Sequence, residues 1–266
     1  MLFCSTTLAG GGGKAGARSN ALGGASTTLS DAWSGTNNAA TLSLVTRPTV
    51  GVSYANHYFL PEVGVSSLGV VLPAGGGVFG ASLHSIAFEG FGQTIVGLSY
   101  GRLLSRNFAL GALVNGMHIR IGNGYGSKWT IDAAVGALFM PNEDLHVGIH
   151  LSNPTRARWS RKSDQRIPTQ LSIGASQVLH DNTRFFIQVD KELDHPINAC
   201  LGVEYQVHRA LTLRTGASSL NRCFSLGFKT ALRRLVMDIC SRWDQRLGFG
   251  GEVSFSYEFG SRKRLE

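Results

Sequence analysis

One stretch near the middle of the chain decides the fold, and it reads Leu145-His146-Val147-Gly148-Ile149-His150-Leu151-Ser152. Apolar residues occupy every second position, and histidine, glycine and serine occupy the positions between them. Successive side chains of a β-strand point to opposite faces, so this pattern gives one apolar face and one small or polar face. A helix, with its period of 3.6 residues, does not separate residues in this way. The stretch therefore predicts a β-strand.

The same alternation recurs from residue 48 to the end of the chain, in segments of about ten residues. It is clearest in the segments 50–55, 96–101, 171–176, 185–190, 201–206, 224–229 and 253–259. Short stretches separate the segments, and most of them contain Gly, Asn, Asp or Pro, residues that favour turns. They lie at 61–62, 73–77, 89–90, 105–107, 123–124, 141–144, 153–168, 181–182, 194–196, 208–209, 221–222, 233–234 and 244–251. We therefore predict about fourteen strands.

Strands of this length suit a membrane, because about 9–11 tilted residues cross the hydrocarbon layer. A soluble sandwich or lipocalin-like barrel would carry many Lys and Glu residues on its solvent face. Here the non-apolar face is mainly Gly, Ser, Ala, Thr and His, which suits a crowded barrel interior. No run of apolar residues reaches the ~18 needed for a membrane-spanning helix. We expect an all-β fold, a transmembrane antiparallel up-and-down β-barrel.

The amino-acid composition is typical of an ordered protein with little water-exposed surface. The 266 residues include 34 glycines, 43% are hydrophobic and only 16% are charged. The glycines have no three-residue period, which excludes a collagen-like chain, and the hydrophobic fraction excludes disorder. The four cysteines have no C-x-x-C spacing, so no zinc or thioredoxin motif is indicated. We expect no metal and no cofactor.

Charged residues on the predicted inner face carry both signs on successive strands. Opposite charges on neighbouring strands can pair inside a barrel, which offsets the cost of removing them from water. We predict that they form a structural network in the lumen, made of Asp190, Glu204, Arg214, Lys229, Asp238, Arg242 and Glu258.

The N-terminal part of the chain does not alternate, and we divide the sequence accordingly. Residues 1–13 are interpreted as the remnant of an export signal or an N-terminal tail, 14–47 as a separate segment, and 48–266 as the barrel. Glycines in the segment would let its backbone approach a wall closely. The segment contains Gly16-Ala17-Arg18, Leu22-Gly23-Gly24-Ala25, Leu29, Asp31, Asn38 and Ala40.

This pattern resembles the N-terminal signature of the FadL/PorV superfamily of outer-membrane barrels, G-A-R-x-x-x-L-G-G-A followed by L-x-D and N-P-A. Ala39 replaces the proline of that signature. The last strand, 246–259, is similar to the closing motif of the family, with Gly251 or Glu252 where a histidine is usual. The resemblance implies a fourteen-stranded barrel in the bacterial outer membrane, whose N-terminal segment folds into the lumen as a hatch. For that hatch we single out Arg18, Gly23, Gly24, Asp31 and Asn38, and we expect Arg18 and Asp31 to tie it to the lumenal charges.

The short hairpins and compact size look most similar to the PorV/PorQ-like branch of Bacteroidota. That branch implies a non-enzymatic accessory subunit of a protein secretion or cell-surface complex of the type IX kind. The alternative is a FadL-like passive channel for hydrophobic small molecules, and a second alternative is an outer-membrane enzyme that modifies lipids. A secretion accessory would have a sealed lumen, whereas a channel would have an apolar pocket.

A basic cluster in the long connection 153–168 has a separate interpretation. Its residues suit a solvated loop, or a loop that contacts anionic lipid or another outer-membrane protein, and no nucleic-acid-binding motif accompanies them. The cluster consists of Arg156, Arg158, Trp159, Arg161 and Lys162.

Enzymatic motifs are weak throughout the chain. His146 and His150 would lie about 13 Å apart along a strand, too far to share a metal ion. The G-x-S-x-G match at 97–101 lies within an alternating segment, whereas a nucleophile elbow needs a strand-to-helix turn. We therefore expect no catalytic residues, and the protein is not predicted to be an enzyme.

Overall fold

The computed structural model describes residues 14–56, 64–88, 90–122, 126–157, 167–193, 195–220, 222–246 and 248–260. Three short helices come first: α1 (Ala17–Ala21), α2 (Ser34–Asn37) and the 3₁₀ helix η1 (Ala39–Leu44). No helix among these residues is long and apolar enough to cross a membrane.

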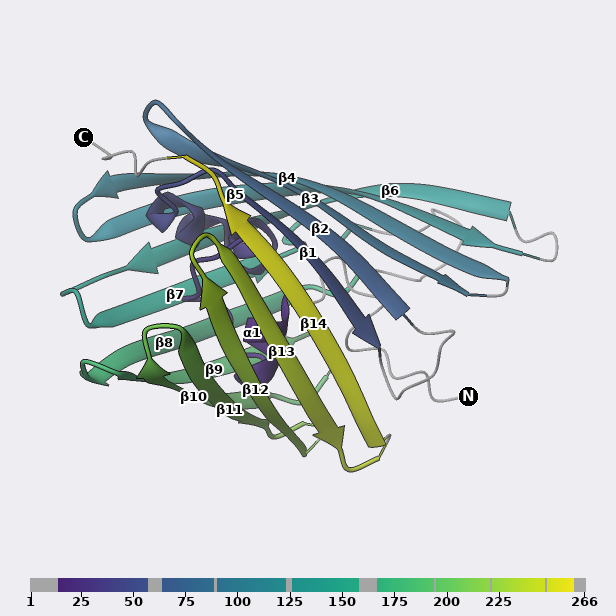
Figure 1. Ribbon diagram of the computed structural model, residues 1–266. Coiled ribbons are helices and arrows are strands. Elements are labelled where there is room, and N and C mark those ends of the chain that lie inside the picture. Colours follow the sequence, from purple (N-terminus) through teal and green to yellow (C-terminus); the bar gives the residue numbers. More distant parts are fainter. Residues whose placement is uncertain are drawn as a thin grey trace.

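Fourteen strands follow, and they form a single closed antiparallel barrel (Figure 1). Each strand pairs with its neighbours in sequence, and β1 pairs with β14 to close the barrel. This confirms the predicted fold class. The strands are β1 (Thr49–Asn56), β2 (Gly64–Ala74), β3 (Gly77–Phe88), β4 (Phe91–Ser105), β5 (Phe108–Ile121), β6 (Gly126–Phe139), β7 (Leu145–Ser152), β8 (Gln170–His180), β9 (Thr183–Glu192), β10 (Asn198–His208), β11 (Leu211–Ser218), β12 (Cys223–Leu232), β13 (Leu235–Asp244) and β14 (Gly248–Glu258).

The apolar face of each strand points outward. Leucine, isoleucine, valine and aromatic side chains are exposed there, whereas the alternate positions face the interior and are mostly buried. Aromatic rings gather near both ends of the outer wall, as in barrels whose amphipathic rings sit at the two membrane interfaces. They include Phe79, Tyr100, Phe139, Tyr257 and Phe259 near one end, and Tyr54, Trp129, Phe224, Trp243 and Phe249 near the other.

The two ends of the barrel differ. At the proximal end, where β1 begins and β14 ends, the connections between strands are short. At the distal end lies the long connection between β7 and β8, and β4 to β6 rise higher than β7 there. β4 has 15 residues and β6 has 14, whereas β7 has 8. Short periplasmic turns and longer outer loops are typical of bacterial outer-membrane barrels, so the proximal end corresponds to the periplasmic side.

The segment 14–47, which we call the hatch, lies inside the barrel and touches its wall at glycines. A Cβ atom on Gly69 would lie 2.7 Å from the carbonyl oxygen of Ala32, and one on Gly202 would lie 2.9 Å from the Cβ of Leu22. Equivalent inward glycines with hatch atoms within 4 Å lie on β1 to β8 and on β10 to β12. They are Gly51, Gly69, Gly80, Gly101, Gly111, Gly136, Gly148, Gly174, Gly202, Gly216 and Gly227.

Several of these glycines face one another across adjacent strands, so they form a belt around the inner wall. Gly101 pairs with Gly111, which pairs in turn with Gly136, and Gly202 pairs with Gly216. On the remaining strands, polar or small side chains contact the hatch instead. Because a side chain at a belt position would occupy the volume of the hatch backbone, the belt determines where the hatch can lie.

A substitution in the belt tests this relation. Gly216→Val would place methyl groups against Leu22 and Gly23, and overpacking of this kind costs about 1–3 kcal/mol. Ala217→Val on the same strand points outward and is the matched control. We expect the first variant to unfold at a lower temperature in heat-modifiability gels and the second to match the parent. Equal unfolding temperatures of the two variants would show that the belt does not constrain the hatch.

Candidate functional site

The hatch begins with tight turns that depend on glycine. Gly16 has a φ of 94°, and the indole of Trp33 occupies the place of its missing side chain. After α1, Gly23 and Gly24 have φ values of 68° and 92°, which turn the chain along the wall. Positive φ values favour glycine, so the Leu-Gly-Gly-Ala motif has a local backbone role.

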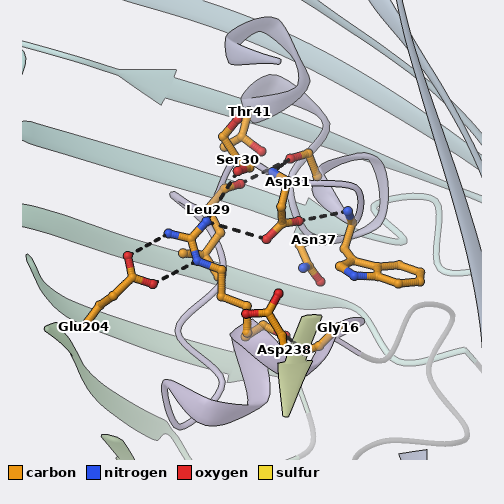
Figure 2. Close-up of polar contacts among 12 residues, drawn as sticks. Gly16, Leu29, Ser30, Asp31, Asn37, Thr41, Glu204 and Asp238 are labelled. Carbon is orange, nitrogen blue, oxygen red and sulfur yellow. Dashed lines mark hydrogen bonds and ion pairs between the residues drawn. The ribbon is translucent and has the colours of Figure 1, made fainter. Parts of the chain in front are cut away.

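Arg18, on α1, holds two parts of the molecule together (Figure 2). Its Nε and Nη2 atoms donate to the two carboxylate oxygens of Glu204 on β10, each at 3.1 Å. Its Nη1 atom lies 3.8 Å from Asp31 Oδ2 and donates to the carbonyl oxygen of Ser30 at 3.4 Å. Arg18 therefore links the start of the hatch, its middle and the barrel wall.

A second arginine shares the Glu204 carboxylate from the wall side. Arg214 Nε on β11 donates to Glu204 Oε2 at 2.7 Å, and its Nη1 pairs with Asp238 on β13. Two guanidinium groups thus alternate with three carboxylates, counting Asp31. We call Arg18, Asp31, Glu204, Arg214 and Asp238 the hatch ion cluster. Alternation of sign and several hydrogen bonds per group offset the cost of burying these charges.

The hatch members of this cluster have shifted pKa values. Burial acts to lower the pKa of Arg18, but Glu204 and Asp31 outweigh it, and the pKa is raised. Burial raises the pKa of Asp31, and the opposing effect of Arg18 does not cancel it. Arg18 therefore stays charged at all physiological pH values, and its charge fixes the cluster.

Three further contacts fasten the hatch elsewhere. Lys14 Nζ lies 2.6 Å from Asp190 Oδ2 on β9, and Asn20 donates to Glu252 on β14. Gln188 Oε1 on β9 accepts from the backbone N–H groups of Ser26 and Thr27 at 2.8 and 2.9 Å. These contacts join the hatch to β9 and β14.

Asn38 has a structural role between the two halves of the hatch. Its Nδ2 donates to the carbonyl oxygens of Thr27 and Ala137, and its Oδ1 accepts from the N–H of Ala40 at 3.1 Å. Ala39, in the place of the signature proline, opens η1. The first N–H groups of a helix have no partner within it, so a residue other than proline fits there.

All seven residues of the predicted lumenal network lie on the inner face, but they do not form one network. Asp190 pairs with the hatch at Lys14, whereas Glu204, Arg214 and Asp238 belong to the hatch ion cluster. Glu258 pairs with Arg47 at 2.9 Å near the proximal end. Lys229 and Arg242 make no ion pair within 4.0 Å in the described part of the chain. The groups are separate because the hatch lies between them and supplies a partner to three of them, namely Lys14 to Asp190, Arg18 to Glu204 and Arg47 to Glu258.

Sequence reasoning missed the roles of Lys14, Asn20, Arg47, Gln188 and Glu252. Gln188 shares the inner face of β9 with Asp190, and Glu252 lies in the closing motif near the usual histidine, so both carried a weak signal. Of the basic connection, Arg156 is exposed at the distal end. The predicted contacts Arg158, Trp159, Arg161 and Lys162 lie outside the described residues.

A cavity of about 200 Å³ lies on the distal side of the hatch. Its wall on β1 to β4 includes apolar side chains, Ala55, Val65, Ile86 and Ile95. The opposite wall is polar and includes His150, Gln170, Ser172, Asp190 and Asn198. The described residues contain no group of three or more His, Cys, Asp or Glu side chains placed to bind a metal.

A second cavity of about 350 Å³ lies on the proximal side of the hatch. Its lining includes Arg18, Asp31, Arg214, Lys229 and Asp238, so it is strongly charged. The hatch thus separates the distal cavity, which has one apolar and one polar wall, from the charged proximal cavity.

The sequence matches no protein-family model and no curated protein. In three dimensions the chain is similar to the toluene transporter TodX of Pseudomonas putida. The TM-score is 0.73 at 12% identity, over 95% of this chain and 99% of TodX. For the CymD monoaromatic hydrocarbon channel the TM-score is 0.70 at 12% identity, over 96% of this chain and 99% of CymD. For a Pseudomonas aeruginosa FadL homologue the TM-score is 0.63 at 13% identity, over 89% of this chain and 96% of the homologue. The chain therefore has the fourteen-stranded fold of these FadL-type barrels, which are described as channels and transporters rather than enzymes.

The hatch ion cluster predicts a coupling between Arg18 and Glu204. Arg18→Met takes a guanidinium partner from both Asp31 and Glu204, and adding Glu204→Gln returns the net charge of the cluster to that of the parent. Contacting residues in one network couple by roughly 0.5–3 kcal/mol, so the double variant should recover part of the stability lost by the single one. We expect Arg18→Met to raise single-channel conductance in planar bilayers, because the hatch is held less firmly.

Arg47→Met is the matched control for this experiment. Its partner Glu258 is 41% exposed, and exposed pairs contribute at most about 1 kcal/mol. Conductance of Arg18→Met equal to that of Arg47→Met would contradict a role of the cluster in closing the lumen.

Proposed function

We propose that this protein is a passive channel of the bacterial outer membrane for small hydrophobic molecules. The observation that carries the proposal is the cavity with an apolar wall above the hatch, in a fold shared along the whole chain with hydrocarbon channels. The apolar outer wall with aromatic rings near both ends supports the membrane location.

The apolar wall of the cavity is continuous across adjacent strands. Val65 pairs with Ala55 on one side and with Ile86 on the other, so these side chains lie in one row. Of the polar groups beside this row, the His84 ring is already bonded, because it lies 2.9 Å from Ser67 Oγ and 3.3 Å from Thr36 Oγ1. Gln93, the register partner of Ile86, has its Nε2 without a hydrogen-bond partner among the described residues. A bound hydrophobic molecule would leave the hydrogen bonds of His84 intact, which favours its binding.

The hatch gives the channel a closed resting state. Below the distal cavity lie the hatch ion cluster and the charged proximal cavity, which oppose passage of an apolar molecule. Transfer past this level requires the hatch to shift or the molecule to leave through the wall.

A second candidate function is a non-enzymatic accessory barrel of a protein secretion or cell-surface complex, similar to the PorV/PorQ-like branch. The hatch, which contacts strands around the barrel and divides the lumen, favours this candidate, since an accessory subunit needs no conducting path. Purification from native outer membranes separates the two candidates. A stable complex with other outer-membrane proteins, together with no binding of hydrophobic compounds, would favour the accessory role.

Filling the distal cavity tests the channel proposal. Ile86→Trp adds bulk at the centre of the apolar row, and overpacking by about 1–3 kcal/mol would weaken toluene binding about tenfold or more. Leu83→Trp, on the outer face of the same strand, is the matched control and should leave binding unchanged. Binding is measured by calorimetry in detergent, and uptake by a toluene flux assay in vesicles. Unchanged toluene binding by Ile86→Trp would rule out this cavity as the binding site.

A further inference from the structure

The outer face of β5 and β6 near the distal end carries an unusual group of side chains. Trp129 and Ile131 are 71% and 70% exposed, the largest values among the exposed hydrophobic side chains of the described residues. The Trp129 ring stacks on His118 of β5, with ring centroids 4.4 Å apart and an interplanar angle of 28°. These two residues are a direct cross-strand pair, so the stack is held by the register of the sheet.

The apolar span of β6 places this stack at the edge of the membrane. Outward positions from Phe139 to Trp129 hold only alanine, valine, isoleucine and the two aromatic residues, and the next outward residue is Ser127. Ten residues rise about 33 Å along a strand, or roughly 25 Å when the strand is tilted, which matches the apolar band of outer-membrane barrels. Trp129 therefore lies at the interface, and residues beyond it lie among the lipid head groups.

A positively charged side chain, that of Arg120, lies at the level of the head groups. Arg120 on β5 pairs in register with Ser127, one outward position beyond the stack, and it is exposed. Arg156 is also exposed, and its segment is joined to the neighbouring edge of β6, because the Asn153 N–H donates to the carbonyl oxygen of Ala133. Asp132 is the one acid among the described residues of β1 to β6, and it is buried on the lumenal face. The outer surface here is positive without a nearby described carboxylate.

We propose that His118, Arg120, Trp129 and Ile131, which we call the β5–β6 patch, bind the phosphate-bearing head group of an outer-leaflet lipid. The Arg120 guanidinium donates to two phosphate oxygens, a geometry that suits arginine. The indole, supported by His118, lies at the level of the glycerol or sugar backbone, and Ile131 packs against the acyl chains. In the patch the charged Arg120 lies next to the apolar side chains of Trp129 and Ile131. This arrangement matches a lipid, which has a charged head group and apolar chains, and does not match a wholly polar anion.

Binding of diphosphoryl lipid A tests the proposal. The purified barrel in detergent is titrated with this lipid and followed by native mass spectrometry, with a dephosphorylated form of the same glycolipid for comparison. One cation near an anionic surface contributes roughly fivefold in affinity, so we expect Arg120→Gln to weaken diphosphoryl lipid A binding by about fivefold and to erase the preference for the phosphorylated form. Trp129→Ala should weaken binding of both forms.

Two matched variants control for non-specific charge effects. Lys128→Gln lies next to Trp129 but on the opposite face of β6, and Arg102→Gln lies on the outer face of β4 near the proximal end. Both should bind diphosphoryl lipid A like the parent, and heat-modifiability gels verify that all variants are folded. Equal binding of the two glycolipids by the parent, equal loss in Lys128→Gln and Arg120→Gln, or capture of an acidic protein with no lipid preference would overturn the proposal.

Discussion

Close contact between the hatch backbone and the glycine belt is the constraint on which the interior depends. At Gly148 and Gly174 the wall meets the backbone and side chain of Thr27, and at Gly111 and Gly136 it meets Asn38 and Ala39. Side chains at these positions would push the hatch toward the barrel axis. The hatch would then lose the backbone hydrogen bonds that Gln188 and Asn38 make across the narrow gap. The large glycine content of the chain is therefore explained in part by the space that a second layer of backbone needs.

The ion cluster depends on this same fit. A buried ion pair stabilises little by itself, because removing charges from water costs about as much as their attraction returns. Arg18 contacts Glu204 with two hydrogen bonds, and this geometry is available only when α1 lies against β11 to β14. The cluster therefore specifies the position of the hatch more than it adds to overall stability. It also makes the proximal half of the lumen unfavourable for apolar molecules.

The sequence alone predicted the strands of the barrel wall well, but it predicted few of the contacts inside the barrel. Alternation in segments such as 145–152 depends only on neighbouring residues, and the turn residues mark each reversal, so fourteen strands and their inward faces were predictable. The partners of the lumenal charges were not, because Arg18 and Glu204 are 186 residues apart and no local pattern specifies their distance. The predicted pairing of lumenal charges across strands occurs for Glu204, Arg214 and Asp238, whereas Asp190 and Glu258 pair with Lys14 and Arg47 of the hatch. The resemblance to the FadL/PorV signature located the hatch, but it did not identify the glycines of the wall that receive it.

The closing pair of strands has a consequence for how the molecule is made. β1 pairs with β14, so the barrel closes only when the last strand of the chain has been placed. The hatch contacts β13 and β14 as well as β3 to β6, so its set of contacts is complete only when that seam has formed. Residues that precede every strand in the chain are therefore among the last to complete their contacts. Contacts of such long sequence separation slow folding, and the rate at which the barrel assembles would be set by the capture of the hatch rather than by formation of the hairpins.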